Sequence, residues 1–300
     1  MTPSNSQNWF TPLTERSLLQ LTGADVLKFL QGQITADIQD FESNSCIYTL
    51  LLTPQGKYLY DIFLYRNGEN IWLDCATEHK SSLIKRLTMF RLRADVQIDD
   101  CSQTHEIIAL SHPQVIQEES ITLFKDPRHN AMEYRTFIPR NNNYSDLISA
   151  GLLENTHSHY DALRFRNQIP DGTADMKSGE DFPLQFRMDD LNAISFTKGC
   201  YIGQEVTARS KHRGVIRKKI FSIKAEREFP TSIDEENKII TLLPSNSNDD
   251  DNNVRKAGRL LSTSQNLGLA LLDCELVNSL HNSNDQLMHN NNVLEIIPST

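Results

Sequence analysis

The chain lacks any long apolar run, and its first residues carry no recognisable targeting pattern. No uninterrupted stretch approaches the roughly 18 apolar residues of a membrane-spanning helix. The opening MTPSNSQNWFTPL has neither the basic and apolar segments of a secretory signal nor the arginine-rich pattern of an organellar presequence. These absences predict a cytoplasmic protein that does not contact a membrane.

An excess of positive charge is also absent. The 300 residues include 30 Lys and Arg against 39 Asp and Glu, which gives a formal net charge of −9. An acidic surface repels the phosphate backbone. The sequence therefore predicts no direct binding to nucleic acid.

Cysteine is scarce, and its spacing excludes two common uses. There are five cysteines, an odd number, and none forms a CxxC pair. This pattern argues against a disulfide framework and against a structural zinc site, so no metal site is predicted. Four of the five lie in apolar or strand-like surroundings and are expected to be small buried hydrophobic residues: Cys46, Cys75, Cys101 and Cys274. Cys200 is the exception.

The first two thirds of the chain mix strand and helix patterns. Residues 46–53 and 57–66 read as strands joined by TPQG, a turn in which Pro54 suits the second position and Gly56 the fourth. A third strand at 71–75 would complete an antiparallel meander. Further strands are expected at 15–22 and 105–111, and helices at 24–32, 78–90 and 158–169. Residues 171–183 have the composition of a loop.

The pattern changes after residue 214. Short strand patterns follow one another without a long helix, at 215–225, 238–243, 256–262, 268–277 and 293–298. Residues 245–253 and 281–286 are expected to be solvated loops. This arrangement predicts a small β-barrel or sandwich with no helix longer than three turns, and a chain of this length has room for more than one domain.

The stretch KGCYIGQEVTAR, residues 198–209, concentrates chemistry that the rest of the chain lacks. Cys200 lies between Lys198 and Tyr201, and glycines at 199 and 203 free the backbone. Seven basic residues and one acidic residue occur between positions 198 and 219. Cations favour the thiolate form of cysteine, which is the nucleophile and the metal ligand. The stretch predicts either a working thiol beside a site for an anion or, alternatively, a buried cysteine at a turn with a solvated basic face.

The octapeptide KGCYIGQE resembles the signature of the YgfZ folate-binding family, which is related to the glycine-cleavage T-protein, an aminomethyltransferase. Its flanks, LNAISFTKGCYIGQEVTARSKHRGVIRKKI, resemble the iron–sulfur-assembly branch of that family. Similar segments cover most of the chain: LTGADVLKFLQGQITADI, LLTPQGKYLYDIFLYR, RFRNQIPDG, AGRLLS and GLALL.

The resemblance implies an α+β fold of the T-protein type, with interleaved α+β domains around a central channel and a C-terminal β-barrel. The folate-binding region would span residues 1–214, as two interleaved domains, and the barrel residues 215–300. The implied function is to bind tetrahydrofolate and to assist synthesis or repair of iron–sulfur clusters in client enzymes, including radical enzymes that modify tRNA. The implied partners are folate and iron–sulfur assembly proteins or cluster-containing enzymes. Cys200 would be the working residue.

Folate chemistry selects further candidates. A reduced pterin presents an N–H and an amino group side by side, and a carboxylate can accept both. Asp61, which lies roughly where T-proteins place an acidic residue near the folate, and Glu205 are the candidates. Gln204 belongs to the same motif, and Arg209 could receive the anionic tail of folate.

Two other functions remain open from the sequence. One is a true aminomethyltransferase, a folate-dependent transferase that needs no cysteine. Arg166 stands where T-protein relatives often carry glutamate, which counts against that reaction. The other is an adaptor that binds folate without using Cys200.

Overall fold

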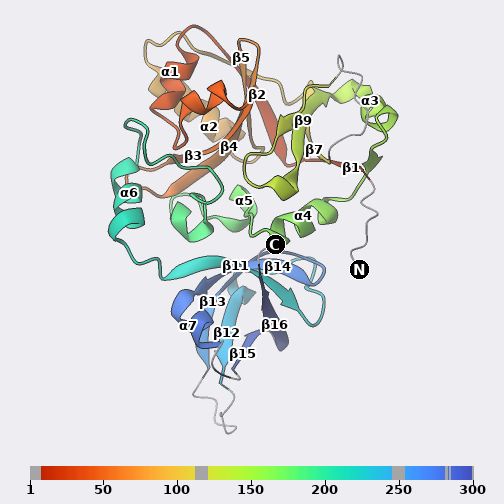
Figure 1. Ribbon diagram of the computed structural model, residues 1–300, viewed down its shortest axis with the longest axis vertical. Coiled ribbons are helices and arrows are strands. Elements are labelled where there is room, and N and C mark those ends of the chain that lie inside the picture. Colours follow the sequence, from red (N-terminus) through yellow and green to blue (C-terminus); the bar gives the residue numbers. More distant parts are fainter. Residues whose placement is uncertain (1–7, 112–120, 245–253, 281–282, 284, 299–300) are drawn as a thin grey trace.

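The computed structural model describes residues 8–111, 121–244, 254–280, 283 and 285–298. These residues form two five-stranded sheets and a closed six-stranded barrel, and Figure 1 shows the barrel below the two sheets. The predicted solvated loop at 245–253 and part of the one at 281–286 lie outside the described residues.

The first sheet contains the predicted meander. Its order is β3-β4-β5-β2-β6, with bounds Cys46–Leu52, Tyr58–Asn67, Asn70–Ala76, Arg16–Thr22 and Gln97–Asp100. Every residue of β3 is buried because both faces of the sheet are covered. Tyr48 and Leu50 face one core, whereas Ile47 and Leu51 face the other. The period-two alternation therefore assigns each side of the strand to a different layer.

Helices cover the second of those faces. α1 and α2 (Val26–Gln31 and Lys80–Arg91) place Leu30 and Leu83 in the same core as Ile47. No helix within the described ranges is both long and apolar enough to cross a membrane.

The second sheet joins the start of the chain to its middle. Its order is β10-β1-β7-β9-β8, with bounds Leu153–Glu154, Trp9–Pro12, His105–Leu110, Tyr134–Pro139 and Phe124–Lys125. The described part of the chain enters this sheet at β1, forms the first sheet with β2 to β6, and returns to the second sheet at β7. The interleaved α+β arrangement expected from the resemblance is thus confirmed.

Short helices and 3₁₀ turns lie between the strands of the sheets, and those after β10 connect the second sheet to the barrel. They are α3 Ser145–Ser149, α4 His157–Arg166, α5 Gly172–Asp175 and α6 Gln204–Arg213, with 3₁₀ turns η1 Ile38–Glu42, η2 Asn130–Met132, η3 Arg140–Asn142 and η4 Pro183–Phe186. α4 and α5 lie between the sheets and the barrel (Figure 1).

The barrel closes in the order β11-β14-β13-β12-β15-β16. The bounds of these strands are Lys218–Ala225, Leu267–Asp273, Arg255–Ser264, Ile239–Leu243, Gln286–His289 and Asn292–Ile297, with η5 Glu235–Asn237 and α7 Cys274–Leu280 between them. α7 has seven residues, about two turns. The prediction of a β-rich module without a long helix is confirmed for the described residues.

Three local expectations were wrong. The strand expected over 268–277 ends at Asp273, whose side chain accepts the backbone N–H groups of Glu275 and Leu276 and so starts α7. β15 was not expected as a strand, and it begins at Gln286, the last residue of the stretch expected to be a loop. The loop at 171–183 contains α5, because the Asp171 carboxylate accepts two backbone N–H groups at its start.

The boundary between the folate-binding region and the barrel stays a prediction. We propose that it lies in the linker of residues 214–217, because α6 ends at Arg213 and β11 begins at Lys218.

Candidate functional site

Lys198 anchors the loop of residues 198–203, hereafter the signature loop. Its Nζ donates to the carbonyl oxygens of Gln31, Ile34 and Ala36, at 2.7, 2.9 and 2.7 Å. Gln31 is the last residue of α1, so the ammonium caps the carbonyl end of that helix and the turn after it. The lysine ties the signature loop to a segment more than 160 residues earlier in the chain.

Burial lowers the pKa of Lys198 to about 8, and the carboxylates of Asp37 and Asp40 oppose that shift. The side chain is 7% exposed and is bound to carbonyl groups. Lys198 is one of the basic residues near Cys200 in the sequence, but all three N–H groups of its ammonium donate to backbone carbonyl groups.

Gly203 fits the signature loop against the first sheet. Its φ is +86°, and an added Cβ would lie 2.6 Å from the carbonyl oxygen of Thr53 and 3.1 Å from the Cα of Gly56. The turn that Gly56 closes, by donating its N–H to the Thr53 carbonyl, therefore packs directly on Gly203. α6 starts at the next residue, and the Thr207 hydroxyl donates to the Gly203 carbonyl.

Cys200 is presented to solvent at the tip of this loop. It is the exposed cysteine among the five, whereas Cys46 and Cys75 are buried and Cys101 and Cys274 are partly buried. No described residue forms a hydrogen bond to its sulfur. The neighbouring Tyr201 is 7% exposed, so the residues on both sides of Gly199 and Cys200 are held in the protein while the thiol is free.

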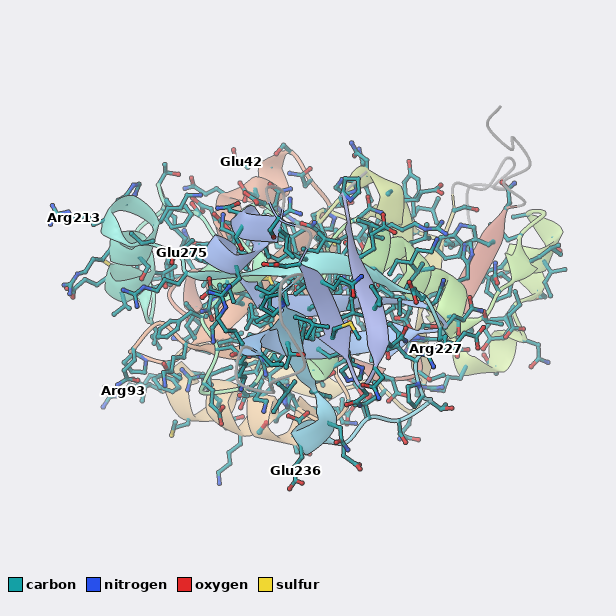
Figure 2. All side chains as sticks on the ribbon, turned by 90° about the horizontal axis from the view of Figure 1, so that it is seen from below. Glu42, Arg93, Arg213, Arg227, Glu236 and Glu275 are labelled. Carbon is teal, nitrogen blue, oxygen red and sulfur yellow. The ribbon has the colours of Figure 1, made fainter. Side chains whose placement is uncertain are left out.

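The other motif residues lie on α6, after the thiol. The Gln204 side chain donates to the Lys198 carbonyl at 3.3 Å, which closes the signature loop. Glu205 does not cap the helix; it forms an exposed ion pair with Arg209 at 2.6 Å. Figure 2 shows Arg213 projecting outward from the end of α6.

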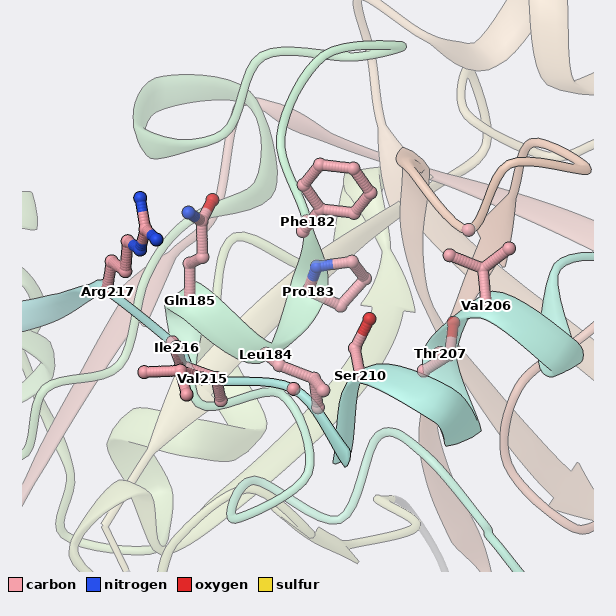
Figure 3. Close-up of a pocket in the computed structure, with 12 residues that line it drawn as sticks. Phe182, Pro183, Leu184, Gln185, Val206, Thr207, Ser210, Val215, Ile216 and Arg217 are labelled. Atoms are coloured by element: carbon pink, nitrogen blue, oxygen red, sulfur yellow. The ribbon is translucent and has the colours of Figure 1, made fainter. Parts of the chain in front are cut away.

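An apolar groove runs between α6 and η4. Figure 3 shows Pro183 and Leu184 facing Val206 and Ser210 across the groove. The volume of the groove is about 270 Å³. Arg217 lines one end. The groove is continuous with the turn that packs on Gly203, because Gly56 also lines it.

Asp61 lies elsewhere, in a cavity of about 180 Å³ between the sheets and the barrel, hereafter the central cavity. Its polar walls include Arg16, Asp61, Arg128, Tyr160, Arg164 and Asp171. Asp61 is 3% exposed. Its Oδ2 accepts from Arg16 Nη1 at 2.9 Å, and its Oδ1 accepts from the Tyr58 hydroxyl at 3.2 Å.

The predicted site residues thus fall into two groups. Cys200, Gln204, Glu205 and Arg209 belong to the signature loop and α6, while Asp61 lines the central cavity. Glu205 and Arg209 are not among the residues that line that cavity. Within the described part of the chain no cluster of three His, Cys, Asp or Glu side chains is arranged to hold a metal ion.

Comparison with known proteins shows which family the chain belongs to. Residues 14–143 match the GCVT N-terminal domain. The chain is 30% identical over 288 residues to "Iron-sulfur cluster assembly factor IBA57, mitochondrial" of Mus musculus, an alignment that covers 88% of this chain and 77% of the mouse protein. The chain belongs to the IBA57 family.

Other IBA57 proteins agree with this assignment. The Homo sapiens protein is 31% identical over 243 residues, which cover 73% of this chain and 67% of the human protein. The Neurospora crassa homologue is 31% identical over 230 residues, which cover 70% of this chain and 52% of that longer protein. The comparisons support a relative of YgfZ within the GcvT-like group, but they do not confirm the YgfZ assignment itself.

The fold expectation is confirmed by a solved structure. The glycine cleavage system aminomethyltransferase T from Bartonella henselae superposes with a TM-score of 0.72 over 97% of this chain and 85% of the other, at 12% identity. At that identity the likeness establishes the fold alone.

The cytoplasmic expectation is wrong. The IBA57 relatives from mouse, Neurospora and human are all named as mitochondrial proteins. The expectation rested on the absence of a long apolar run and of a recognisable targeting pattern, and neither absence identifies a compartment.

The sequence reasoning missed the charged residues around Asp61. Asp74 and Arg135 lie within strands and are buried completely, with an ion pair of 2.6 Å between them. The signal was present in the sequence, since IWLDC places an aspartate inside an apolar strand pattern and buried charges require partners.

Replacing Lys198 with methionine tests its anchoring role in this IBA57-family chain. The Lys198→Met variant leaves three carbonyl groups without their donor, so we expect a loss of about 1–3 kcal/mol in the free energy of unfolding. Hydrogen exchange should rise in residues 198–203 and 31–36. Lys219→Met, at an exposed position, is the control and should change neither quantity. Unchanged exchange in Lys198→Met would show that the lysine does not hold the loop.

Proposed function

We propose that this chain is an iron–sulfur cluster assembly factor that acts through the thiol of Cys200. The observation that carries the proposal is the exposed Cys200 on an anchored loop in a member of the IBA57 family. The relatives are named as iron–sulfur cluster assembly factors. A thiol held in place by Lys198 and Gly203, yet open to solvent, can be reached by another protein.

One cysteine does not hold a cluster alone, because clusters take several thiolate ligands. Cys200 therefore acts together with a second protein, as one ligand at a shared interface, as a transfer point, or as a redox-sensitive thiol. The partners we propose are iron–sulfur assembly proteins and cluster-containing client enzymes. Radical enzymes that modify tRNA belong to the client class implied by the resemblance.

The cluster role is tested by rescue. Cells depleted of their own IBA57 protein and expressing this chain in mitochondria should recover the activity of cluster-dependent enzymes, measured against cluster-free enzymes of the same compartment. Recovery supports the proposal, and its absence, with the chain present at normal levels, contradicts it.

We further propose that the central cavity binds reduced folate. Asp61 lies in a cavity whose walls carry both carboxylates and guanidinium groups, and these match the donors and acceptors of a pterin edge. The exposed position of Glu205, already paired with Arg209, makes it the weaker candidate for this contact.

A calorimetric titration with tetrahydrofolate tests the folate site. We expect a dissociation constant in the micromolar range, which corresponds to a binding free energy of about −8 kcal/mol. Asp61→Asn should weaken binding, because it removes the negative charge of Asp61 from the cavity and one of the two charge partners of Arg16, whereas Glu205→Gln should not. The reverse pattern would place the folate site at α6, and no heat with the wild-type chain would show that the protein does not bind tetrahydrofolate.

A further inference from the structure

Asp171 is a residue of the central cavity that has been given no role in the proposed folate site so far. It precedes α5, which Figure 1 places between the first sheet and the barrel. It also lines the central cavity with Asp61. The next residue, Gly172, lies so close to the first sheet that an added Cβ would sit 1.9 Å from Asp61 Oδ1. The backbone at Asp171 is thereby held beside Asp61.

The two oxygens of the Asp171 carboxylate have different surroundings. Oδ1 accepts three hydrogen bonds, from the N–H groups of Thr173 and Ala174 at 3.0 and 3.1 Å and from the Thr173 hydroxyl at 2.8 Å. These bonds cap α5. Oδ2 accepts no hydrogen bond from any described residue. Capping therefore accounts for one oxygen and leaves the other open.

Two other carboxylates of the cavity, those of Asp61 and Asp161, are already paired. Asp61 forms an ion pair with Arg16 at 2.9 Å, and Asp161 forms one with Arg164 at 2.6 Å. Asp171 forms no ion pair with the residues that the structure describes. Among these three carboxylates it alone offers an oxygen without a partner.

Two nearby guanidinium groups keep the Asp171 carboxylate ionised without forming an ion pair with it. Burial alone would raise its pKa, but Arg164 and Arg16 hold the pKa well below its ordinary value. Both guanidinium groups donate to other carboxylates, so they favour the ionised form without occupying Oδ2. Oδ2 of Asp171 is therefore an ionised acceptor in the cavity that can accept a hydrogen bond from a ligand.

We propose that Oδ2 of Asp171 binds the ligand of the central cavity by accepting hydrogen bonds from adjacent ring N–H and amino groups. The 2-amino-4-oxopyrimidine edge of a reduced pterin has this pattern, so the inference rests on the proposed folate site and names its specificity-determining contact. A volume of about 180 Å³ is below the ~300 Å³ of a typical site for a whole drug-sized ligand, so the cavity holds the ring end and the remainder extends outward. Asp61, bound by Arg16, forms the adjoining wall.

Asp171→Asn separates the binding role from the capping role. Asparagine caps a helix about as well as aspartate, so α5 and the thermal unfolding midpoint should be retained. The amide presents an NH₂ group where Oδ2 accepted, and tetrahydrofolate should bind roughly 10- to 100-fold more weakly. Asp99→Asn, the same substitution at an exposed residue of β6 outside the central cavity, is the matched control and should bind as wild type.

An analogue with methyl in place of the 2-amino group isolates the contact. The wild-type chain should prefer tetrahydrofolate over this analogue, and Asp171→Asn should lose most of that preference, which a thermodynamic cycle quantifies. An unchanged preference in Asp171→Asn overturns the inference even if overall binding falls. If the wild-type chain binds neither compound, the proposed folate site itself is wrong. That result differs from one in which the wild-type chain binds tetrahydrofolate but Asp171→Asn has no effect on the preference.

Discussion

Replacing Cys200 with serine is expected to abolish support of cluster-dependent enzymes while leaving the fold intact. Serine has nearly the shape of cysteine, and Cys200 is exposed with no hydrogen bond to its sulfur, so the free energy of unfolding should change by no more than about 0.5 kcal/mol. A hydroxyl cannot supply the thiolate that acts as nucleophile and metal ligand. Rescue of depleted cells should therefore fall to the level seen without the chain.

Two controls make this result specific. Cys274→Ser, at a partly buried cysteine, should retain rescue. Iodoacetamide should label Cys200 before Cys75, because burial raises the pKa of Cys75 to about 12 and leaves its thiol protonated. Full rescue by Cys200→Ser would instead favour the adaptor that binds folate without using its thiol.

Replacing Asp74 with asparagine is expected to cause the largest loss of stability. Asp74 is fully buried and bridges Arg16 and Arg135 at 2.6 Å each, and it also accepts from the Tyr65 hydroxyl at 2.9 Å. The substitution leaves two buried guanidinium groups short of a charge partner, so we expect a loss of about 3–5 kcal/mol. Asp99→Asn, on the exposed edge strand β6, should change stability by less than about 0.5 kcal/mol.

The pH dependence gives a second readout for Asp74. Burial alone would raise its pKa, but Arg16 and Arg135 hold the pKa below the ordinary value. Its stabilising contribution is therefore complete above the unfolded pKa of about 3.9 and is lost as pH falls through the lower folded pKa. The difference between wild type and Asp74→Asn in chemical denaturation should be constant from about pH 7 to 5 and shrink in stronger acid. A difference that grows in acid would contradict this assignment.

The first sheet and the barrel could be predicted because their strands carry the pattern themselves. β3 and β4 are long, adjacent in sequence and joined by a turn whose Gly56 needs a positive φ of 73°. The second sheet was recognised only at β7. Its other strands have two to six residues and pair across distances such as Trp9 with Leu153, so no local periodicity reveals them.

The site was predicted in its residues more than in its geometry. The signature octapeptide identified Cys200 and the residue types around it. Their order in the sequence did not show which way each side chain points in the folded protein. Lys198 turns inward to three carbonyl groups of a distant segment, and Gly203 makes room for a turn rather than for access to the thiol. The paired charges of the central cavity come from strands and helices far apart in the chain, so only the folded arrangement shows that Asp171 keeps a free oxygen.

Cluster transfer between purified components would show whether Cys200 acts in cluster assembly. A cluster-loaded assembly protein and a cluster-free client enzyme are mixed with or without this chain, and client activity is followed with time. We expect that the wild-type chain increases client activation and that Cys200→Ser does not. Equal activation with wild type, with Cys200→Ser and with no added chain would contradict the assignment of this protein as an assembly factor acting through Cys200.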